Sequence, residues 1–446
     1  MLRAVGVLVV ALLVVPRMAE AGNSDDVVAG NDVALTGGAV VANVHTGGAM
    51  WFNPAGVARL DARSVDLTGA ILSYSLVSAP GSLSIQSGEQ SEGDYSAIQA
   101  IPRALTFVAS PRPELRWGIG FFFSRSLSRF LQDTVATEPG STEPSEFFAS
   151  ADETNSLYHL SGVVAWKKSE KFLLGGGLDI VIASRRLTQI ITGGYDDGQR
   201  GTFDRSFNQS VAGGGLQMKA GMQWAPIEEV RIGWSVATPS YLVYLDNEIT
   251  ATQSLSPPPS VPPAPPVSPD FRGTQIDDLS GAWAGVETGL TRLGAAYLRP
   301  WGWVEADVIV HFPLQTPELG IDRKTTADVR IGGIFRITDR LKLGGGFFTD
   351  FSPEREPSEF ADSKLNFYGF TLGVDFANRF EPPEGGEDGF YLAFAAAFRY
   401  SHGSGTLAGI EFPSTFPNPA SQPGQLNFIG IKINEFGINL AVKAAF

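Results

Sequence analysis

Side chains with catalytic chemistry are few in this sequence. It has no cysteine, and its four histidines are His45, His159, His311 and His402. No HExxH or GxSxG motif accompanies them, and the lack of thiolates removes disulfides and cysteine metal sites. His402 and Ser404, in His402-Gly403-Ser404, could serve an acyl hydrolase as base and nucleophile. Because two such residues often match by chance, we expect no enzyme, no cofactor and no metal, and keep the hydrolase as an alternative.

A turn inside an apolar run is the second unusual feature. Asn53-Pro54-Ala55-Gly56 interrupts Met50–Leu60, where proline lacks an N–H and glycine turns freely. Upstream, Asn31–Gly48 is rich in small residues that suit backbone packed tightly inside another element. We therefore predict a compact, turn-rich plug with Asn53-Pro54-Ala55 as its hinge. The alternative is a plain turn packed against a surrounding wall.

The chain beyond this plug alternates with a period of two residues. In the last segment Phe436, Ile438 and Leu440 alternate with Gly437 and Asn439. Apolar residues on one face and small or polar residues on the other, in segments of about ten, are typical of strands that face lipid. The strands predicted in this way are 64–76, 103–110, 115–126, 156–167, 172–185, 208–224, 230–252, 283–298, 303–312, 326–337, 341–351, 365–380, 390–402 and 429–446.

Short and long connections take turns between these strands. Segments such as 111–114, 168–171 and 381–389 are short, whereas 127–155, 253–282 and 403–428 are long. A transmembrane barrel has short turns on one side and long loops on the other, and a soluble sandwich has no reason to sort loops in this way. We predict an all-β fold, a 14-stranded antiparallel transmembrane β-barrel with an N-terminal hatch (plug) inside the lumen.

Composition and the first residues agree with a membrane barrel. The sequence has 51 Gly and 30 Phe, and only 18% of it is charged, which suits short strands. Its net charge of −14 argues against a nucleic-acid partner. Residues 1–21 resemble a secretory signal peptide, with an apolar run at Val5–Val15 and a small-x-small end at Ala19-Glu20-Ala21. No later segment has about 18 uninterrupted apolar residues, so a mature chain that crosses a membrane must use strands.

The plug resembles a known family. Asn31–Leu60, with Asn53-Pro54-Ala55 where that family has its NPA motif, is similar to the hatch of FadL-type outer-membrane transporters of long-chain fatty acids and other hydrophobic compounds. Gly233–Tyr241 and Leu341–Pro353 are further similar stretches. The resemblance implies a fourteen-stranded barrel and passive uptake: a hydrophobic molecule is captured outside, the hatch shifts, and the molecule leaves through a gap beside a kinked third strand.

Inward residues are the candidates for ligand contact. The inward faces are dominated by glycine, alanine and apolar residues, and their ionisable residues are few. Arg399 and Arg330 fall in the outer half of the lumen, where a fatty-acid carboxylate would need a cation, and Phe122 offers an apolar contact. The alternative for Arg330 is a pair with Asp307, which lies nearly opposite on the neighbouring strand.

Two glycines of the third predicted strand allow two interpretations. Gly118 and Gly120 share its inward face. Their missing side chains either permit a kink that opens the wall sideways or simply make room for the hatch.

The predicted organisation is a signal peptide (1–21), a hatch (22–63) and a barrel (64–446). We expect a monomer, exported by the Sec route to the outer membrane, with hydrophobic small molecules, membrane lipid and lipopolysaccharide as partners and no nucleic acid. The alternatives to hydrophobic uptake are a general porin, a purely structural barrel and, from His402 and Ser404, the acyl hydrolase.

Overall fold

The computed structural model describes residues 28–61, 63–137, 145–195, 201–256, 285–316, 321–357, 360–380, 390–414 and 424–446. The predicted signal peptide and the predicted turn at 381–389 lie outside these residues. Within them, every helix is too short or too polar to cross a bilayer.

Fourteen strand positions form a closed ring in which every neighbouring pair is antiparallel. The predicted number of strands is therefore confirmed. In ring order they are β1 (Arg63–Ser78), β3 (Asp94–Arg112), β4 (Leu115–Ala136), β5 (Ser145–Ser169), β6 (Phe172–Tyr195), β7 (Gly201–Ile227), β8 (Val230–Ala237), β10 (Leu290–Arg299), β11 (Gly302–His311), β14 (Thr326–Arg336), β15 (Leu341–Asp350), β16 (Ser363–Phe380), β17 (Phe390–Phe412) and β18 (Gln425–Ala445).

Four short or partial strands supplement the ring: β2 (Leu83–Ile85), β9 (Tyr241–Ser256), β12 (Leu314–Thr316) and β13 (Ile321–Arg323). β9 continues the position of β8 along β7, β2 pairs in parallel with the end of β17, and β12 and β13 form a hairpin. The single strand predicted at 230–252 is thus wrong, because Thr238-Pro239-Ser240 separates β8 from β9. Proline cannot donate to a ladder and is disfavoured within a sheet.

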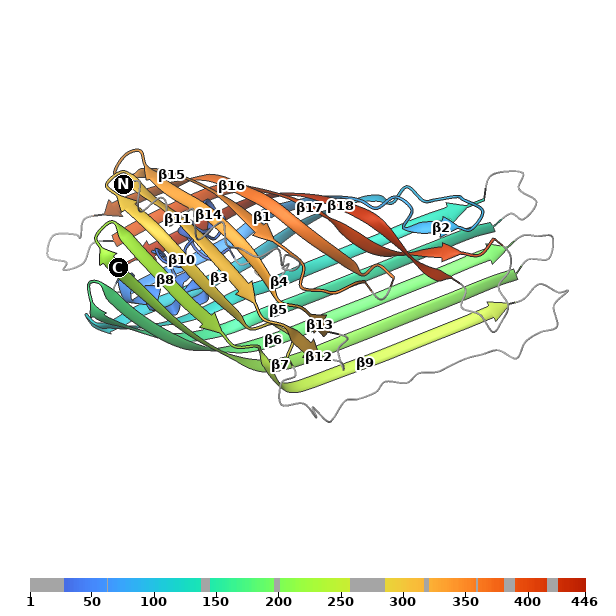
Figure 1. Ribbon diagram of the computed structural model, residues 1–446, viewed down its shortest axis with the longest axis horizontal. Helices are drawn as coiled ribbons and strands as arrows, with labels where there is room; N and C mark the ends of the chain where they lie inside the picture. Colours follow the sequence, from blue (N-terminus) through green and yellow to red (C-terminus); the bar gives the residue numbers. More distant parts are fainter. Residues whose placement is uncertain are drawn as a thin grey trace.

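The ring is much taller on one side than on the other. β4 to β7 have 22, 25, 24 and 27 residues, whereas β10, β11 and β15 have 10 each. Figure 1 shows β4 to β7 and β9 projecting far beyond the short strands. The long loop predicted at 127–155 is therefore wrong, since β4 runs to Ala136 and β5 begins at Ser145. The loop predicted at 403–428 is likewise shorter, because β17 runs to Phe412.

An apolar belt surrounds the short-turn end of the barrel. The C-terminus lies at the same end (Figure 1). Large apolar side chains are exposed there on successive strands, for example Leu178 and Ile180 on β6 and Leu372 on β16. Because a strand needs only about 9–11 residues to cross a bilayer, this belt suffices to span it. Exposed apolar side chains in such a band are typical of a membrane barrel, and the tall strands continue beyond it.

The N-terminal segment (Val28–Leu60) lies inside the ring at the short-turn end (Figure 1). It contains α2 (Asn31–Thr36), α3 (Ala49–Phe52) and the 3₁₀ helix η1 (Pro54–Arg59). The wall approaches it at glycines: a Cβ added at Gly221 would lie 2.1 Å from Asn53 Oδ1, and one at Gly346 would lie 1.9 Å from Thr36 O. Inward glycines on the strands therefore provide the space that this segment occupies.

Two apolar clusters fill the lumen at different heights. The inner cluster joins the N-terminal segment to the wall and includes Met50, Phe52, Phe122 and Val163. The outer cluster lies among the tall strands and β2. Its members include Leu131, Phe147, Ile191, Phe203 and Phe412. Phe147 and Phe412 stack with ring centroids 4.3 Å apart.

Candidate functional site

Barrel carboxylates hold the backbone of the N-terminal segment. Asp307 Oδ2 accepts hydrogen bonds from the N–H groups of Val40 (2.8 Å) and Val41 (3.1 Å). Glu305, two residues away on β11, accepts the N–H of Ala42 at 2.5 Å. Val40, Val41 and Ala42 lie between the helices and have no regular secondary structure. Their buried N–H groups therefore need acceptors from elsewhere, and the barrel wall supplies them.

Polar contacts fix the same segment on other sides of the ring. Asn31 Nδ2 donates to Asp375 Oδ1 at 3.0 Å, and Gly47 N donates to Asp66 Oδ2 at 3.0 Å. Arg292 donates to the carbonyl of Trp51 at 3.1 Å. The segment is therefore attached to strands all round the barrel rather than to one wall.

Within the segment, Asp32 joins its two halves. Asp32 Oδ2 accepts the N–H of His45 at 2.6 Å. Burial raises the pKa of Asp32, and the ammonium of Lys342 and the N–H of His45 act in the opposite direction.

The predicted hinge lies against the wall. Asn53 Nδ2 donates to the carbonyls of Val41 (2.8 Å) and Met222 (3.1 Å), and its Oδ1 accepts the N–H of Ala55 at 3.1 Å. Asn53 thus caps η1, in which Pro54 is the first residue, and joins the segment to β7. The role of Asn53, Pro54 and Ala55 as a gating hinge stays a prediction.

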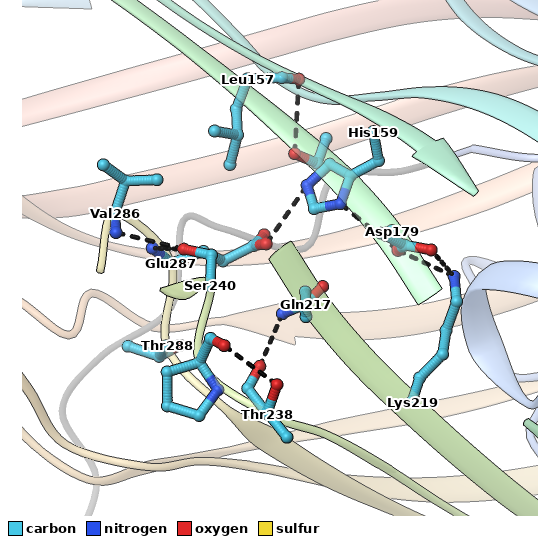
Figure 2. A network of polar contacts seen from close by, with 12 residues as sticks. Leu157, His159, Asp179, Gln217, Lys219, Thr238, Ser240, Val286, Glu287 and Thr288 are labelled. Carbon is cyan, nitrogen blue, oxygen red and sulfur yellow. Dashed lines mark hydrogen bonds and ion pairs between the residues drawn. The ribbon is translucent and has the colours of Figure 1, made fainter. Parts of the chain in front are cut away.

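Four buried side chains form a polar layer inside the barrel, and Figure 2 shows the contacts among them. Its members are His159 on β5, Asp179 on β6, Lys219 on β7 and Glu287. Lys219 Nζ lies 2.8 and 2.9 Å from the oxygens of Asp179. His159 lies between two carboxylates, with Nδ1 3.4 Å from Asp179 Oδ2 and Nε2 3.2 Å from Glu287 Oε2.

The order of residues along β5 locates this layer between the two apolar clusters. Val163 belongs to the inner cluster and Phe147 to the outer one, and His159 lies between them on the same strand. The layer contacts the N-terminal segment directly, because the His159 ring meets Trp51 edge-on at 4.8 Å and Lys219 lies 5.7 Å from the Trp51 ring centroid.

Glu287 belongs to a strap, Gly285–Gly289, that precedes β10 and has no regular secondary structure. Ser240 Oγ accepts the N–H groups of Val286 (3.1 Å) and Glu287 (2.9 Å), as Figure 2 shows. Thr316 exchanges two hydrogen bonds with Gly285, and Arg323 donates to the Val286 carbonyl at 3.0 Å. The strand predicted at 283–298 therefore begins later, at Leu290, since the strap leaves the ladder to reach the lumen.

The two predicted cations line one small cavity together with Val28 and Phe348. The Arg399 guanidinium lies 4.4 Å from the Phe348 ring centroid, and Arg330 lies 5.7 Å from that of Phe52. The cavity volume of about 20 Å³ is enough for roughly one water molecule. A hydrophobic ligand therefore requires movement of the N-terminal segment to enter there.

Arg330 and Asp307 are opposite each other in the β11–β14 register, as predicted. The carboxylate of Asp307 nevertheless accepts the N–H groups of Val40 and Val41. The sequence could show that the two residues face each other, but not that a third segment also binds Asp307.

The third strand of the ring, β4, separates from β3 part of the way up. Their ladder ends at Ala104 and Phe122, while β3 continues along β1 and β4 continues along β5. We call this the β3–β4 split. Phe122 is fully buried at its base and packs on Trp51 with ring centroids 5.5 Å apart.

The two inward glycines lie just below this split. A Cβ at Gly118 would come within 2.6 Å of Met50 Cε, and one at Gly120 within 2.6 Å of the Phe122 ring. Gly118 therefore makes room for the N-terminal segment, and Gly120 makes room for Phe122. The interpretation that these glycines make room for the hatch is thus supported at Gly118, and the kink that opens the wall stays a prediction.

The prediction that inward ionisable residues are few is wrong. Asp179, Lys219, Glu305 and Asp307 are all buried. Alternation was the available signal, since Leu160, Ile180 and Met218 are exposed and the residue before or after each must face inward. Glu287 lies on no strand, so alternation gives no information about it.

The pair with hydrolase spacing is not assembled as a catalytic unit. His402 Nδ1 lies 3.0 Å from Asn434 Oδ1 on β18. In the described part of the chain no hydrogen bond between His402 and Ser404 is seen. The described residues also contain no group of three or more histidine and acidic side chains arranged to hold a metal ion.

Several solved structures have a similar fold. A Pseudomonas aeruginosa FadL homologue aligns with a TM-score of 0.57 and 14% identity, over 95% of this chain and 99% of that one. The CymD monoaromatic hydrocarbon channel aligns with a TM-score of 0.52 and 12% identity, over 95% of this chain and 99% of that one. The Ralstonia pickettii toluene transporter TbuX aligns with a TM-score of 0.52 and 14% identity, over 94% of this chain and 98% of that one. The sequence matches no family model, and no curated protein matches it. At these identities the comparisons show the fold.

Proposed function

We propose that the protein is a FadL-type outer-membrane channel for passive uptake of hydrophobic small molecules, either long-chain fatty acids or related hydrocarbons. The N-terminal segment is its hatch. The observation that carries this proposal is a belted barrel whose lumen is filled by that segment instead of being open to water. The fold shared with hydrocarbon channels supports it.

The outer cluster is the proposed capture site. Its inward apolar side chains come from the tall strands beyond the belt. Burial of each CH₂ group of a ligand contributes about 0.8 kcal/mol, which for a long chain exceeds the entropic cost of ordering it. Capture therefore needs no energy source and no chemistry.

The hatch must then move to let the molecule pass. Asn53, Pro54 and Ala55 supply the proposed hinge. Arg330 and Arg399 supply cations for the carboxylate of a fatty acid, and Phe122 supplies an apolar contact.

Release is proposed to occur sideways into the membrane through the β3–β4 split. The absent ladder above Phe122, with Gly118 and Gly120 just below it, supports this route. Surrounding lipid and lipopolysaccharide are the expected neighbours of a monomer in the outer membrane.

The test is uptake by proteoliposomes of radiolabelled toluene, a long-chain fatty acid and a small sugar. We expect toluene or the fatty acid to enter and the sugar to be excluded. Equal entry of the sugar would favour a general porin, and entry of none would favour a structural barrel. Release of acyl chains from lipid A that is lost in Ser404→Ala would favour the hydrolase.

A further inference from the structure

The strap enters the lumen next to the N-terminal segment, where Glu287 and Val286 contact inward residues of β5 and β6. We propose that Gly285–Gly289 is a second gate, separate from the hatch, and that the contact of Glu287 with His159 holds it shut. This inference rests on the proposed function, since a gate needs a transported molecule.

The position of the strap supports this role. A molecule that travels from the outer cluster to the inner one must pass the level of His159, because the three lie in that order along β5. Val286 of the strap packs with Leu157 and Val181. These two residues lie two positions from His159 on β5 and from Asp179 on β6, on the same inward face. Strap and polar layer therefore occupy the same cross-section of the barrel.

The chemistry of this cross-section opposes an apolar molecule. All four polar-layer residues are less than a tenth exposed. Separating buried charged groups to admit an apolar body leaves them without partners, which is unfavourable. Passage is therefore easiest if the strap carries Glu287 out of the lumen and leaves Lys219 and Asp179 paired on the wall.

The strap can make such a movement without breaking the ladder of the barrel. Its attachments include hydrogen bonds to Ser240, Thr316 and Arg323, which lie outside the fourteen ring strands. The C-terminal part of the strap also contacts the end of β11, because Thr288 Oγ1 lies 3.4 Å from His311 Nδ1 and Gly289 O accepts the N–H of Phe312 at 2.7 Å. The movement therefore concerns Gly285–Glu287, which precede these contacts. Inside the lumen Glu287 contacts the wall residue His159. That contact joins the movable strap to the fixed wall.

The same contact connects the strap to the hatch. His159 meets Trp51 edge-on, and Arg292, three residues after the strap, donates to the Trp51 carbonyl. Breaking the contact between Glu287 and His159 therefore changes the surroundings of Trp51, a residue of the N-terminal segment. The strap would open first and the hatch second along the route of the ligand.

The decisive experiment compares Glu287→Gln with the unchanged full-length chain in proteoliposomes, using the initial rate of radiolabelled toluene uptake. The amide keeps the shape of the side chain and removes its charge, so the closed state is weakened and uptake rises about fivefold. Glu153→Gln is the matched control. Glu153 on β5 pairs with Arg185 on β6 at 2.9 Å, and these two strands also carry His159 and Asp179 of the polar layer. That variant keeps the original rate.

A second variant removes the other partner. His159→Gln is expected to accelerate uptake like Glu287→Gln, and the double variant is expected to be no faster than either, because both changes disrupt one contact. Heat-modifiable electrophoretic mobility, measured for each variant, confirms a folded barrel. Either single variant is sufficient for the test if the other does not fold.

The results separate the gate from the transport function. Toluene uptake by the unchanged chain with no acceleration in Glu287→Gln or His159→Gln overturns the gate and leaves the function standing. Equal acceleration in Glu153→Gln also overturns it, since any lost charge would then suffice. Uptake no greater than that of empty vesicles in every variant overturns the proposed function itself.

Discussion

Two of the regions that obstruct the lumen, the N-terminal segment and the outer cluster, are built from different interactions. At the short-turn end, the N-terminal segment is attached by hydrogen bonds between its backbone and wall side chains: Asp307 and Asp66 accept backbone N–H groups, and Arg292 donates to a backbone carbonyl. At the opposite end, the outer cluster is formed by apolar side chains of the strands themselves, such as Phe147 and Phe412. An apolar ligand can replace apolar contacts with its own, but it cannot replace hydrogen bonds. We therefore expect the outer region to admit ligand by local repacking and the hatch to move as a unit.

Phe147→Ala removes the centre of the outer cluster and has the largest expected effect. Phe147 is fully buried and stacks on Phe412, so truncation lowers the free energy of unfolding by about 3–5 kcal/mol. Urea unfolding in detergent micelles measures the change. Phe148→Ala, at the half-buried neighbouring position, is the control and should cost much less. Equal losses would show that the outer region is not a packed core.

Asp307→Ala tests the opposite region. The substitution leaves the N–H groups of Val40 and Val41 without their acceptor, which costs about 1–3 kcal/mol for each buried group left unsatisfied. Hydrogen exchange should become faster at Val40 and Val41 and stay unchanged in β5. Asp322→Ala, which breaks an exposed pair with Arg355, is the control. Faster exchange throughout the barrel would mean that the two regions unfold together.

Asn53→Ala tests whether the hinge holds the hatch in place. It removes the bonds to Val41 O and Met222 O and the cap on Ala55. The hatch is expected to lose about 1–2 kcal/mol of local stability, and toluene uptake should become faster. Asn434→Ala, a change on β18 that removes an acceptor of Tyr400, serves as the control. Unchanged exchange in the hatch would make Asn53 a plain turn residue.

Arg399→Gln has the smallest expected effect and refines the ligand class. If a carboxylate passes near Arg399, affinity for a fatty acid falls by about 1 kcal/mol or more, whereas affinity for toluene is unchanged. Competition binding in detergent with both ligands measures the difference. Arg379→Gln, at an exposed position near the end of β16, should alter neither. An equal loss for both ligands would assign Arg399 to packing on Phe348.

Sequence alone could predict the strand count, because fourteen segments alternate and their turns sort by length. It could not place the outer ends of β4 and β5, since Phe147, Ala149 and Ala151 continue the alternation among polar residues that read as a loop. The position of the Asn53-Pro54-Ala55 stretch inside the barrel could be predicted from its turn and its small neighbours.

The polar layer could not be predicted. His159 and Lys219 come from strands distant in sequence, and Glu287 comes from a strap that has no periodicity.

The unequal height of the ring has a consequence for its response to the bilayer. We expect the belt side chains to contact lipid tails, so that a thinner or thicker membrane strains the part of the barrel that contains the N-terminal segment. The outer parts of β5 to β7 continue beyond the belt, and aromatic contacts of Phe147 with Phe203 and Phe412 pack them together. Membrane thickness should accordingly tune how readily molecules leave the barrel while having little influence on how they are first captured.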